Sequence, residues 1–550
     1  MNEIFCKHLL EYRKRAGYSQ KDMSGKLLIE ESLYSQYENG TAEPGFDALI
    51  RIADVLKCSL DELLGRNSDY RNSWIDSGVV REEQVLYGRP RDKKKVLIGL
   101  QDFRRLRELH AYYVDKTMMI GEFLDSSYQI TLITRPRRFG KTMNMSMLAE
   151  FLDCTKDSRM IFEGTRVSRT EWMTELNQCP VIFLSLLEIK SDTAEGMLWQ
   201  LSGRIREEYK RYYNMLNSGK LSGDQVEEFN HIYDVLTYVQ SKEQWKNCII
   251  RSILVLCEVL SLYYGKNVYL LIDEYDTPFM SANTNGYYSE VRSVLAGFLS
   301  TSLKGNPYLE RAMLTGIQRV AKENIFSGLN NLTVLTVNDS EYEDCFGFTE
   351  EEVRKLLDDF DLEFTDEVKE TYDGYRFGNK DIYNPWSVTN YAVRKRLAPY
   401  WVNTAENSIL KDALRERGTT FEKEYNELIE TGEITTVVSL TTAYYEHQSD
   451  ASLWGLMVNA GMLTVKEIMG DDYYTLRIPN QEVWSAFREL TAFSLQIDEG
   501  DMQKLFMELI RGNIDEFAER YQNILLTLPS YHDLQCENSY HMMVLGMCVF

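Results

Sequence analysis

The segment QITLITRPRRFGKTMNMSMLAEFL, residues 129–152, decides the fold of the central part of the chain. Its Gly140-Lys141-Thr142 is the end of the phosphate-binding pattern G-x-x-x-x-G-K-[ST], although Arg135 stands where that pattern has its first glycine. The β-branched run 129–134 predicts a buried parallel strand before the loop, and apolar residues recur at helical spacing after it. Strand, loop and helix in this order predict a nucleotide-binding P-loop rather than a basic run that ends in GKT by chance.

The residues of this loop suit the binding of a magnesium-bound nucleotide. Backbone N–H groups at the start of the helix would surround the phosphates, Lys141 would reach the β- and γ-oxygens, and Thr142 would bind Mg²⁺. Pro136 stiffens the loop where glycine usually lets it bend. The residues expected to contact the nucleotide are Arg135, Pro136, Arg137, Arg138, Phe139, Gly140, Lys141, Thr142 and Met143.

A second run, VYLLIDEYD at 268–276, supplies two carboxylates at the end of another buried strand. Asp273 suits a place among the Mg²⁺ ligands, and Glu274 suits the role of a base that polarises the attacking water. An ordinary exit from strand to loop would explain this pattern if it stood alone. Together with the upstream GKT, the order of the two motifs favours an NTPase.

Two further strands are expected, at 180–187 and 311–318. The first falls between the two motifs in the chain, which suits the P-loop ATPases that insert a strand between the nucleotide loop and the metal carboxylate. The second ends near Thr315 and Gln318, either of which is a candidate sensor of the γ-phosphate. Arg319 is a candidate for stabilising charge in the transition state, with a plain surface arginine as the alternative.

Four motifs in order resemble the bacterial AAA-ATPase-like family. They are YYVDKTMMIGEFL (112–124), LITRPRRFGKTMNMSMLAEFL (132–152), LLIDEYDTPF (270–279) and LTGIQRVAKENIFSGLNNL (314–332). In that family RPRRFGKT is the normal form of the loop, so the resemblance implies an α/β P-loop core that uses ATP and Mg²⁺. It also draws attention to Asp115 and Lys116, which would shape the nucleotide pocket or form an ion pair at a strand edge.

The N-terminal segment, 1–66, predicts a small helical module. Ser19 caps a second helix with Asp22 as its partner, and ESLYSQYENG forms a third helix closed by Asn39-Gly40. RKRAGYSQKDMSGKL, SQYENG and ALIRIADVLKCSLDELL resemble the Cro/C1-type helix-turn-helix family. The resemblance implies DNA binding, with Gln20 on a phosphate and Ser32, Ser35 and Gln36 facing the major groove.

Charge leaves a second interpretation of this module open. Acidic residues outnumber basic ones within 1–66, and Glu30-Glu31 begin the recognition helix. Carboxylates that face a groove lined with phosphates weaken binding. The alternative is a helical module kept for protein contacts or dimerisation.

Length and composition predict a multidomain protein. The chain has 550 residues, a formal net charge of −23 and nine cysteines without a C-x-x-C pair, which favours a reducing cytoplasm. The apolar stretch 248–264 is broken by Arg251 and Glu258 and predicts a buried helix rather than a membrane span. The expected domains are a helix-turn-helix module (1–66), a linker (67–100), an ATPase core (101–345), a lid or winged-helix-like segment (346–405) and a mostly helical region (406–550).

The C-terminal part carries weaker signals. Thr349 and Glu352 predict a capping box, and Arg376 is either a nucleotide contact from the lid or part of a packed aromatic loop. Family members continue into a PD-(D/E)XK nuclease-like region, which ENSYHMMVLGM at 537–547 resembles. The catalytic strand of that region would follow this helix, so we expect a truncated nuclease-like domain in which Glu537 cuts no DNA.

These patterns favour an ATP-binding and ATP-hydrolysing switch fused to a DNA-binding module. One alternative is a Cro/C1-type transcriptional regulator whose ATPase core senses an effector. Another is a remnant of an ATPase-nuclease protein without activity of its own. The expected partner is DNA through residues 1–66, no membrane is expected, and a homo-oligomer is left open.

Overall fold

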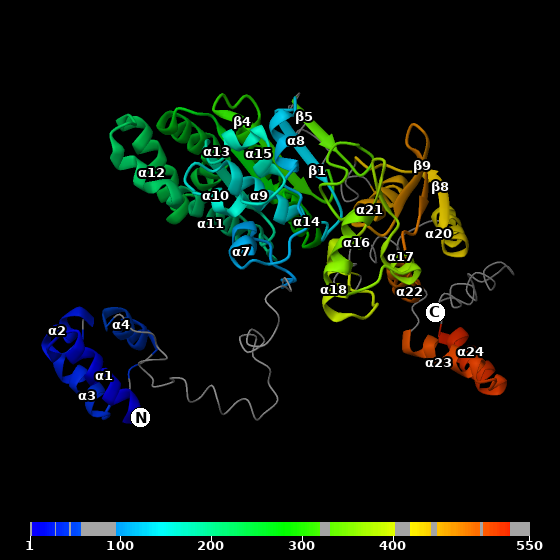
Figure 1. The fold of residues 1–550 in the computed structure, drawn as a ribbon, viewed down its shortest axis with the longest axis horizontal. Coiled ribbons are helices and arrows are strands. Elements are labelled where there is room, and N and C mark those ends of the chain that lie inside the picture. Colours follow the sequence, from blue (N-terminus) through cyan, green and yellow to red (C-terminus); the bar gives the residue numbers. More distant parts are fainter. Residues whose placement is uncertain are drawn as a thin grey trace. The chain divides into compact units, whose positions relative to one another are not determined.

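The computed structural model describes residues 3–27, 29–42, 44, 46–56, 95–319, 331–401, 419–441, 448–494 and 499–527. The chain forms two compact units, Met1–Lys93 and Lys94–Phe550, and each is described here by itself (Figure 1). The segment 537–547, which resembles part of a nuclease-like region, lies outside the described residues.

Four helices make up the described part of the first unit. They are α1 (Glu3–Arg15), α2 (Gln20–Leu27), α3 (Glu31–Asn39) and α4 (Phe46–Leu56). Ser19 and Asp22 bond each other's backbone N–H groups at the start of α2, which confirms the predicted cap. Gly40 ends α3 with a φ of 74°, a conformation that glycine adopts without strain. The helices close over the apolar side chains Phe5, Leu9, Met23, Leu27, Tyr34 and Ile52.

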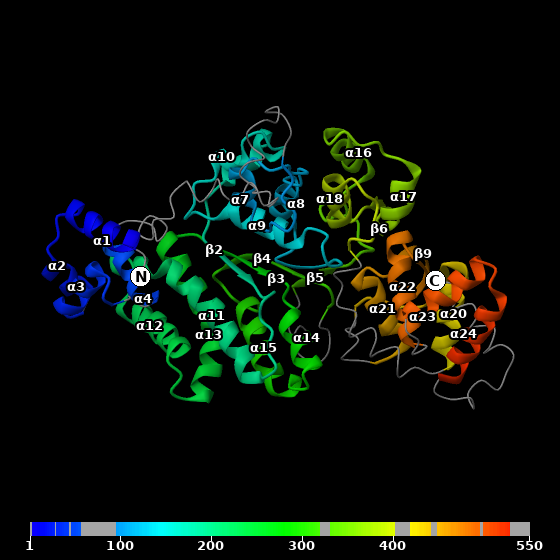
Figure 2. The ribbon, with the colours of Figure 1, turned by 90° about the horizontal axis from the view of Figure 1, so that it is seen from below.

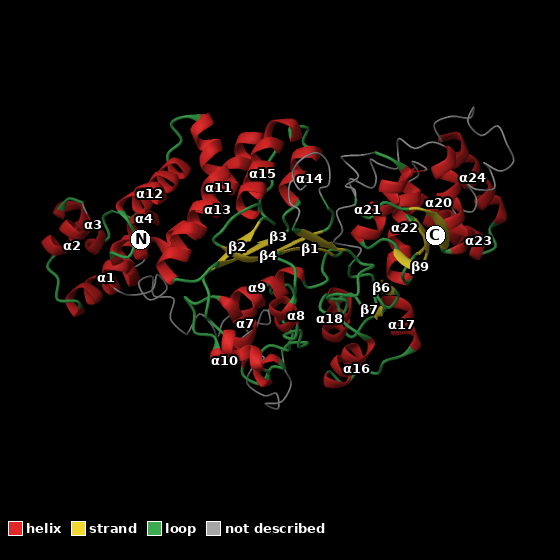
Figure 3. Cartoon of the chain, turned by 90° about the horizontal axis from the view of Figure 1, so that it is seen from above, coloured by secondary structure: helices red, strands yellow, loops and turns green. Residues whose placement is uncertain are grey.

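A parallel sheet of five strands forms the centre of the second unit (Figure 3). Its strands are β1 (Ile130–Thr134), β2 (Val181–Ser185), β3 (Val268–Asp273), β4 (Leu309–Gly316) and β5 (Leu332–Leu335), in the spatial order β2-β3-β4-β1-β5. The register pairs Thr134 with Gly316, and Ser185 with Asp273. All carboxyl ends therefore meet at one edge, where ligands bind in sheets of this kind.

The order of the strands corrects one expectation. The strand predicted at 180–187 does not stand between β1 and β3, because β2 lies at the edge of the sheet. The inserted strand is β4, which pairs with β1 on one side and β3 on the other. Chain order does not fix the order in the sheet, because each parallel strand needs a crossover that can skip a neighbour.

Helices cover both faces of this sheet (Figures 2 and 3). One face carries α7 (Phe103–Glu108), α8 (Met119–Asp125), α9 (Lys141–Leu152), α10 (Arg159–Phe162) and the short helices η3 (Val167–Arg169) and η4 (Glu171–Glu175). The other carries α11 (Ala194–Tyr212), η5 (Tyr213–Ser218), α12 (Gly223–Thr237), α13 (Lys242–Tyr264), α14 (Thr277–Thr284) and α15 (Tyr288–Leu303). Within the described residues, α13 alone is long and apolar enough to cross a membrane, but it packs against α12 and α15 as a core helix.

The chain then continues through a helical region that contains a second, smaller sheet. The first part comprises α16 (Glu350–Asp359), α17 (Asp366–Tyr372), the hairpin β6 (Tyr375–Phe377) and β7 (Lys380–Ile382), and α18 (Pro385–Arg394). The rest comprises α20 (Thr419–Thr431), β8 (Glu433–Val437), α21 (Asp450–Ala460), β9 (Thr464–Gly470), β10 (Tyr473–Arg477), α22 (Gln481–Ser494), α23 (Glu499–Ile510) and α24 (Ile514–Thr527).

The antiparallel sheet β8-β10-β9 was missed by the prediction from helical periodicity after residue 405. Along β8, Ile434 and Thr436 are buried while Thr435 and Val437 are exposed. This alternation has a period of two, which marks a strand with one buried face. One apolar core joins this region to the P-loop face of the main sheet, because Phe139, Tyr375, Trp401 and Trp454 belong to the same cluster.

Candidate nucleotide site and DNA-facing helix

The loop between β1 and α9 contains two residues with a left-handed backbone. Gly140, immediately before α9, has a φ of 88°, and Arg138 has a φ of 68°. A Cβ built on Gly140 would meet no described atom within 4 Å, so the glycine is needed for its backbone angle and not for space. This turn lets the chain enter α9 directly after the loop.

Lys141 lies inside the curve of this loop. Its Nζ donates to the carbonyl oxygens of Arg135 at 3.0 Å and Pro136 at 3.1 Å, and lies 3.3 Å from Oε1 of Glu274. The side chain is buried. The ammonium group therefore already has oxygen partners where phosphate oxygens would offer stronger ones.

Asp273 and Thr142, the two predicted metal ligands, lie next to each other. Oδ1 of Asp273 accepts from the Thr315 hydroxyl at 2.5 Å, while the buried Oδ2 has no hydrogen bond of normal geometry to a described residue. Burial, together with the charge of Glu274, raises the pKa of Asp273 to about 6, and interactions with the hydroxyls of Thr315 and Thr142 counteract that rise. A buried carboxylate oxygen without a donor, beside a hydroxyl, fits Mg²⁺, which binds hard oxygen ligands.

Glu274 adopts an unusual backbone conformation. Its φ is 52°, a region that costs a side chain with a Cβ some free energy. Its N–H points at the Thr315 hydroxyl at 3.4 Å, and its carboxylate reaches Lys141. The left-handed turn after β3 thus brings the predicted base to the P-loop lysine.

Asp276 is a buried carboxylate to which the sequence analysis gave no role. Its Oδ2 accepts from the backbone N–H groups of Ile317 and Gln318, both at 2.9 Å, which ties the end of β3 to the end of β4. Burial and the charge of Glu274 raise its pKa to about 6. The sequence did contain a signal for Asp276, because it is the third carboxylate in the segment LLIDEYD. Gln318 is buried beside this tie, and Arg319 is half-buried at the end of the described segment.

The residues before Gly140 pack against the rest of the protein. The buried Arg135 guanidinium donates to the carbonyl oxygens of Thr336 at 2.5 Å and Thr134 at 3.0 Å, and burial lowers its pKa to about 10. Phe139 lies in the core, with its ring centroid 5.0 Å from that of Tyr375. These two side chains make structural contacts in the protein core.

The arginines in the middle of the loop face the helical region that follows the sheet. The Arg138 guanidinium stacks on Trp386 at 3.8 Å from the ring centroid, and the Arg137 carbonyl accepts from the indole N–H of Trp401 at 3.2 Å. Pro136 is buried close to Gly461. The loop is therefore held by residues that lie hundreds of positions away in the chain.

A cavity of about 590 Å³ adjoins the loop. Its polar and loop residues include Arg137, Arg138, Gly140, Lys141, Thr142, Lys190, Glu274 and Thr277. Its apolar lining includes Val96, Leu97, Ile98, Leu100, Tyr113, Val114, Met143, Phe348, Leu356, Pro385 and Trp386. A volume of this size is typical of a small-molecule site, and a lining that combines charged and apolar side chains suits a nucleotide.

The other residues singled out in the sequence lie around this cavity or away from it. Lys116 lines it and pairs with Glu352 of α16 at 2.6 Å, whereas Asp115 accepts from the backbone N–H groups of Thr117 and Arg166. Arg376 pairs with Asp381 at 3.5 Å across the β6–β7 hairpin and does not line the cavity.

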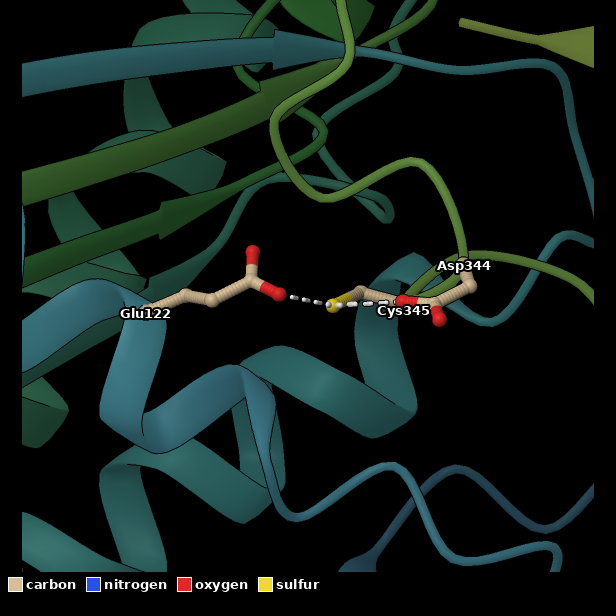
Figure 4. Close-up of side chains that lie close together, drawn as sticks. All are labelled: Glu122, Asp344 and Cys345. Carbon is tan, nitrogen blue, oxygen red and sulfur yellow. Dashed lines mark hydrogen bonds between the residues drawn. The ribbon is translucent and has the colours of Figure 1, made fainter. Parts of the chain in front are cut away.

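A second group of side chains could hold a metal ion by proximity alone. Glu122, Asp344 and Cys345 lie close together (Figure 4). Each carboxylate already has a partner, since Glu122 accepts from the Tyr342 N–H and Asp344 binds Lys380 at 2.6 Å. These contacts account for the group without a metal.

The exposed face of α3 carries the residues predicted to read DNA. Ser32 and Gln36 are exposed and Ser35 is half-exposed, while Tyr34 and Tyr37 on the opposite face enter the core. Ser35 also accepts from Asn39 at 3.3 Å, so Asn39 extends this polar face. Glu31 lies on the exposed side as well.

Gln20 is held by a buried network that the sequence analysis missed. Its Nε2 donates to Oε2 of Glu38 at 2.7 Å, and the same carboxylate receives Arg13 in a bidentate pair at 2.5 and 3.0 Å. Arg13 and Gln20 counteract burial, so the pKa of Glu38 is below its usual value. The network connects α1, α2 and α3 and fixes the direction of the Gln20 side chain.

Comparison with known proteins agrees with this architecture. A helix-turn-helix family model matches residues 9–63, and a family model described as predicted AAA-ATPase matches residues 97–326. An uncharacterized protein in the vnfD 5′ region of Azotobacter chroococcum is 27% identical over 417 residues, 72% of this chain and 70% of that protein.

Two regulators of Bacillus subtilis are similar to the N-terminal part. The HTH-type transcriptional regulator ImmR is 38% identical over 89 residues, 14% of this chain and 70% of that protein. The uncharacterized HTH-type transcriptional regulator YqaE is 38% identical over 66 residues, 12% of this chain and 57% of that protein. The chain thus spans little more than half the length of YqaE.

Proposed function

Because the chain joins a helix-turn-helix domain to a domain of the predicted AAA-ATPase family, we propose that it is a nucleotide-dependent switch on DNA. In this proposal the second unit binds Mg²⁺-ATP in the cavity beside the P-loop and hydrolyses it in the cytoplasm. The first unit binds DNA through α3, and the nucleotide state sets how well it does so.

One observation carries the nucleotide part of this proposal. Five residues meet at the carboxyl edge of the sheet, at or just beyond the ends of β1, β3 and β4 and beside the cavity: Lys141, Thr142, Asp273, Glu274 and Thr315. An ion pair alone would explain Lys141 and Glu274. It would not explain the buried Asp273 oxygen without a donor, nor the hydroxyls on either side of that carboxylate.

The arrangement supports a division of roles. Lys141 would exchange the loop carbonyls for oxygens of the β- and γ-phosphates. Thr142 and Asp273 would hold Mg²⁺, which neutralises charge on the phosphates when bound. Glu274 would accept a proton from water as the water oxygen bonds to the γ-phosphorus and the bond to ADP breaks. Thr315 would hold the Asp273 carboxylate in place.

The apolar side chains that line the cavity support adenine as the base. Among the described residues that line the cavity, Glu274 is the only carboxylate, and it pairs with Lys141. Guanine presents N–H donors on its N1 and N2 that a carboxylate would pair, and leaving them without a partner is costly. Adenine lacks this adjacent pair of donors, and its ring suits the apolar side chains near Trp386.

The direct test is nucleotide binding by Lys141→Ala. We expect the purified wild-type protein to bind Mg²⁺-ATP in isothermal titration calorimetry and this variant to lose the heat of binding. Lys304→Ala, which changes an exposed lysine on the same unit that does not line the cavity, is the matched control. Equal affinities in Lys141→Ala and the wild type would refute the nucleotide site. Phosphate release, followed with and without DNA, tests hydrolysis separately.

A second candidate function is a transcriptional regulator in which the ATPase core only senses an effector. The exposed polar face of α3 favours it, with Ser32, Ser35 and Gln36 pointing outward over a well-packed core. The test is nuclease protection of DNA at physiological salt, with no nucleotide, with ADP and with ATP. A palindromic site that is protected equally with ADP and with ATP supports the regulator. Weak binding without sequence preference contradicts it.

A further inference from the structure

We propose that Lys190 is a second cation for the nucleotide and contacts its terminal, γ-phosphate. This inference rests on the proposed nucleotide site and adds to it a residue that none of the sequence motifs contains. Lys190 lines the same cavity as Lys141, Glu274 and Thr277. The residue is exposed to the solvent.

The position of Lys190 follows from the pairing of β2 with β3. Ser185 at the end of β2 is in register with Asp273 at the end of β3, and the next N–H, that of Leu186, donates to the Asp273 carbonyl at 2.9 Å. The chain after β2 therefore continues alongside the carboxylates. Lys190 follows a few residues later, on the β2 side of Glu274.

The backbone on either side of Lys190 is held in place. Ile189 is buried, and its N–H donates to the Leu186 carbonyl at 3.1 Å. The Ser191 carbonyl accepts from the Tyr287 hydroxyl at 2.6 Å and from Asn285 at 3.2 Å, and the Ser191 N–H donates to Ser281 at 3.3 Å. A cation on a fixed backbone loses less freedom when it binds a phosphate than one on a free loop.

The two lysines approach the site from opposite directions. Lys141 comes from the β1 side, where the loop and the start of α9 surround the phosphates nearer the base. Lys190 follows β2, Lys141 follows β1, and Glu274 follows β3, which stands between β1 and β2 in the order of the sheet. With the base against the apolar residues near Trp386, the phosphate farthest from the base would be the one that reaches the β2 side. A cation there would offset the charge that develops on the γ-phosphate during transfer.

The test compares two nucleotides that differ in that phosphate. Dissociation constants for Mg²⁺-AMP-PNP and Mg²⁺-ADP are measured by isothermal titration calorimetry on the full chain. We expect Lys190→Ala to weaken AMP-PNP about tenfold and to leave ADP unchanged, as the loss of one charge-assisted contact predicts. Lys190→Arg should keep most of the AMP-PNP affinity, and Lys210→Ala, on the exposed side of α11, should match the wild type.

Other outcomes of this titration would contradict either the γ-phosphate contact or the nucleotide site itself. Equal weakening of both nucleotides would overturn the assignment to the γ-phosphate, and so would unchanged affinity for both. A wild-type protein that binds neither nucleotide would overturn the proposed site itself, and the two failures are therefore distinguishable. Unchanged thermal unfolding of Lys190→Ala would exclude misfolding as the cause of a loss.

Discussion

Replacing Thr315 with valine should shift the pH dependence of Mg²⁺ binding at the nucleotide site, so that a higher pH is needed for the same affinity. Protons and Mg²⁺ compete for Asp273, whose pKa burial and the charge of Glu274 raise to about 6. The Thr315 hydroxyl, 2.5 Å from Oδ1, stabilises the ionised form. Valine keeps the shape of threonine but removes that donor, so the proton should compete more strongly in the variant.

The size of the effect follows from the strength of the lost hydrogen bond. A hydrogen bond to a charged group contributes about 1.5–3 kcal/mol, and one pKa unit corresponds to about 1.4 kcal/mol, so the pKa of Asp273 should rise by at least about one unit. A rise of one unit in the pKa of Asp273 makes Mg²⁺ binding about fivefold weaker at pH 6. At pH 8 binding is nearly unchanged, because the Asp273 carboxyl is ionised in both the wild type and the variant.

Calorimetric titration of Mg²⁺ into protein with AMP-PNP, at several values between pH 5.5 and pH 8, measures this difference. Protonation of the nucleotide affects both proteins equally. The difference between the pH midpoints of Mg²⁺ affinity in the wild type and in Thr315→Val therefore measures the difference in the pKa of Asp273. Asp273→Asn, which has no titrating carboxyl at this position, should lose most of the Mg²⁺ affinity at every pH. Coincident midpoints for the wild type and Thr315→Val would refute the role of this hydrogen bond.

Three further substitutions test other contacts. Glu274→Gln removes the carboxylate that competes for Lys141, so nucleotide should bind several-fold more tightly while phosphate release stops; weaker binding in calorimetry would contradict this. Arg135→Met leaves the carbonyls at the end of β5 without their donor and should lower the free energy of unfolding by about 3 kcal/mol; urea unfolding followed by tryptophan fluorescence measures it, and an unchanged midpoint refutes it. Glu38→Ala leaves the partly buried guanidinium of Arg13 without its carboxylate and should destabilise the N-terminal unit by about 3 kcal/mol. Hydrogen exchange of α1–α4 reports this, and unaltered protection would disprove it.

Local sequence patterns predicted much of the fold. The β1–loop–α9 unit, the strands that end at Asp273 and Gly316, the Ser19 cap and the Thr349–Glu352 capping box are all present in the structure. Caps and periodicity depend on residues three or four positions apart, so a short window of sequence contains the whole signal. The assignments of these residues to nucleotide, metal and DNA stay predictions.

The features that the sequence did not predict depend on contacts between residues far apart in the chain. Two of the acceptors of Arg135, the carbonyls of Leu335 and Thr336, lie about two hundred positions away at the end of β5 and just after it. The β8-β10-β9 sheet pairs segments that each look short and ambiguous alone. Asp276 and Glu38 are buried carboxylates whose donors come from other elements, and no local pattern distinguishes them from exposed ones.

The sequence by itself determined that a strand, a GKT loop and a helix form a P-loop, and that a second strand ends in Asp273-Glu274. Only the tertiary structure decided that β4 stands between them, that Arg135 faces the core and that Lys190 reaches the cavity. The reason is physical. Periodicity fixes which face of an element is apolar, whereas the packing of all elements into one core decides which faces and which strand ends meet.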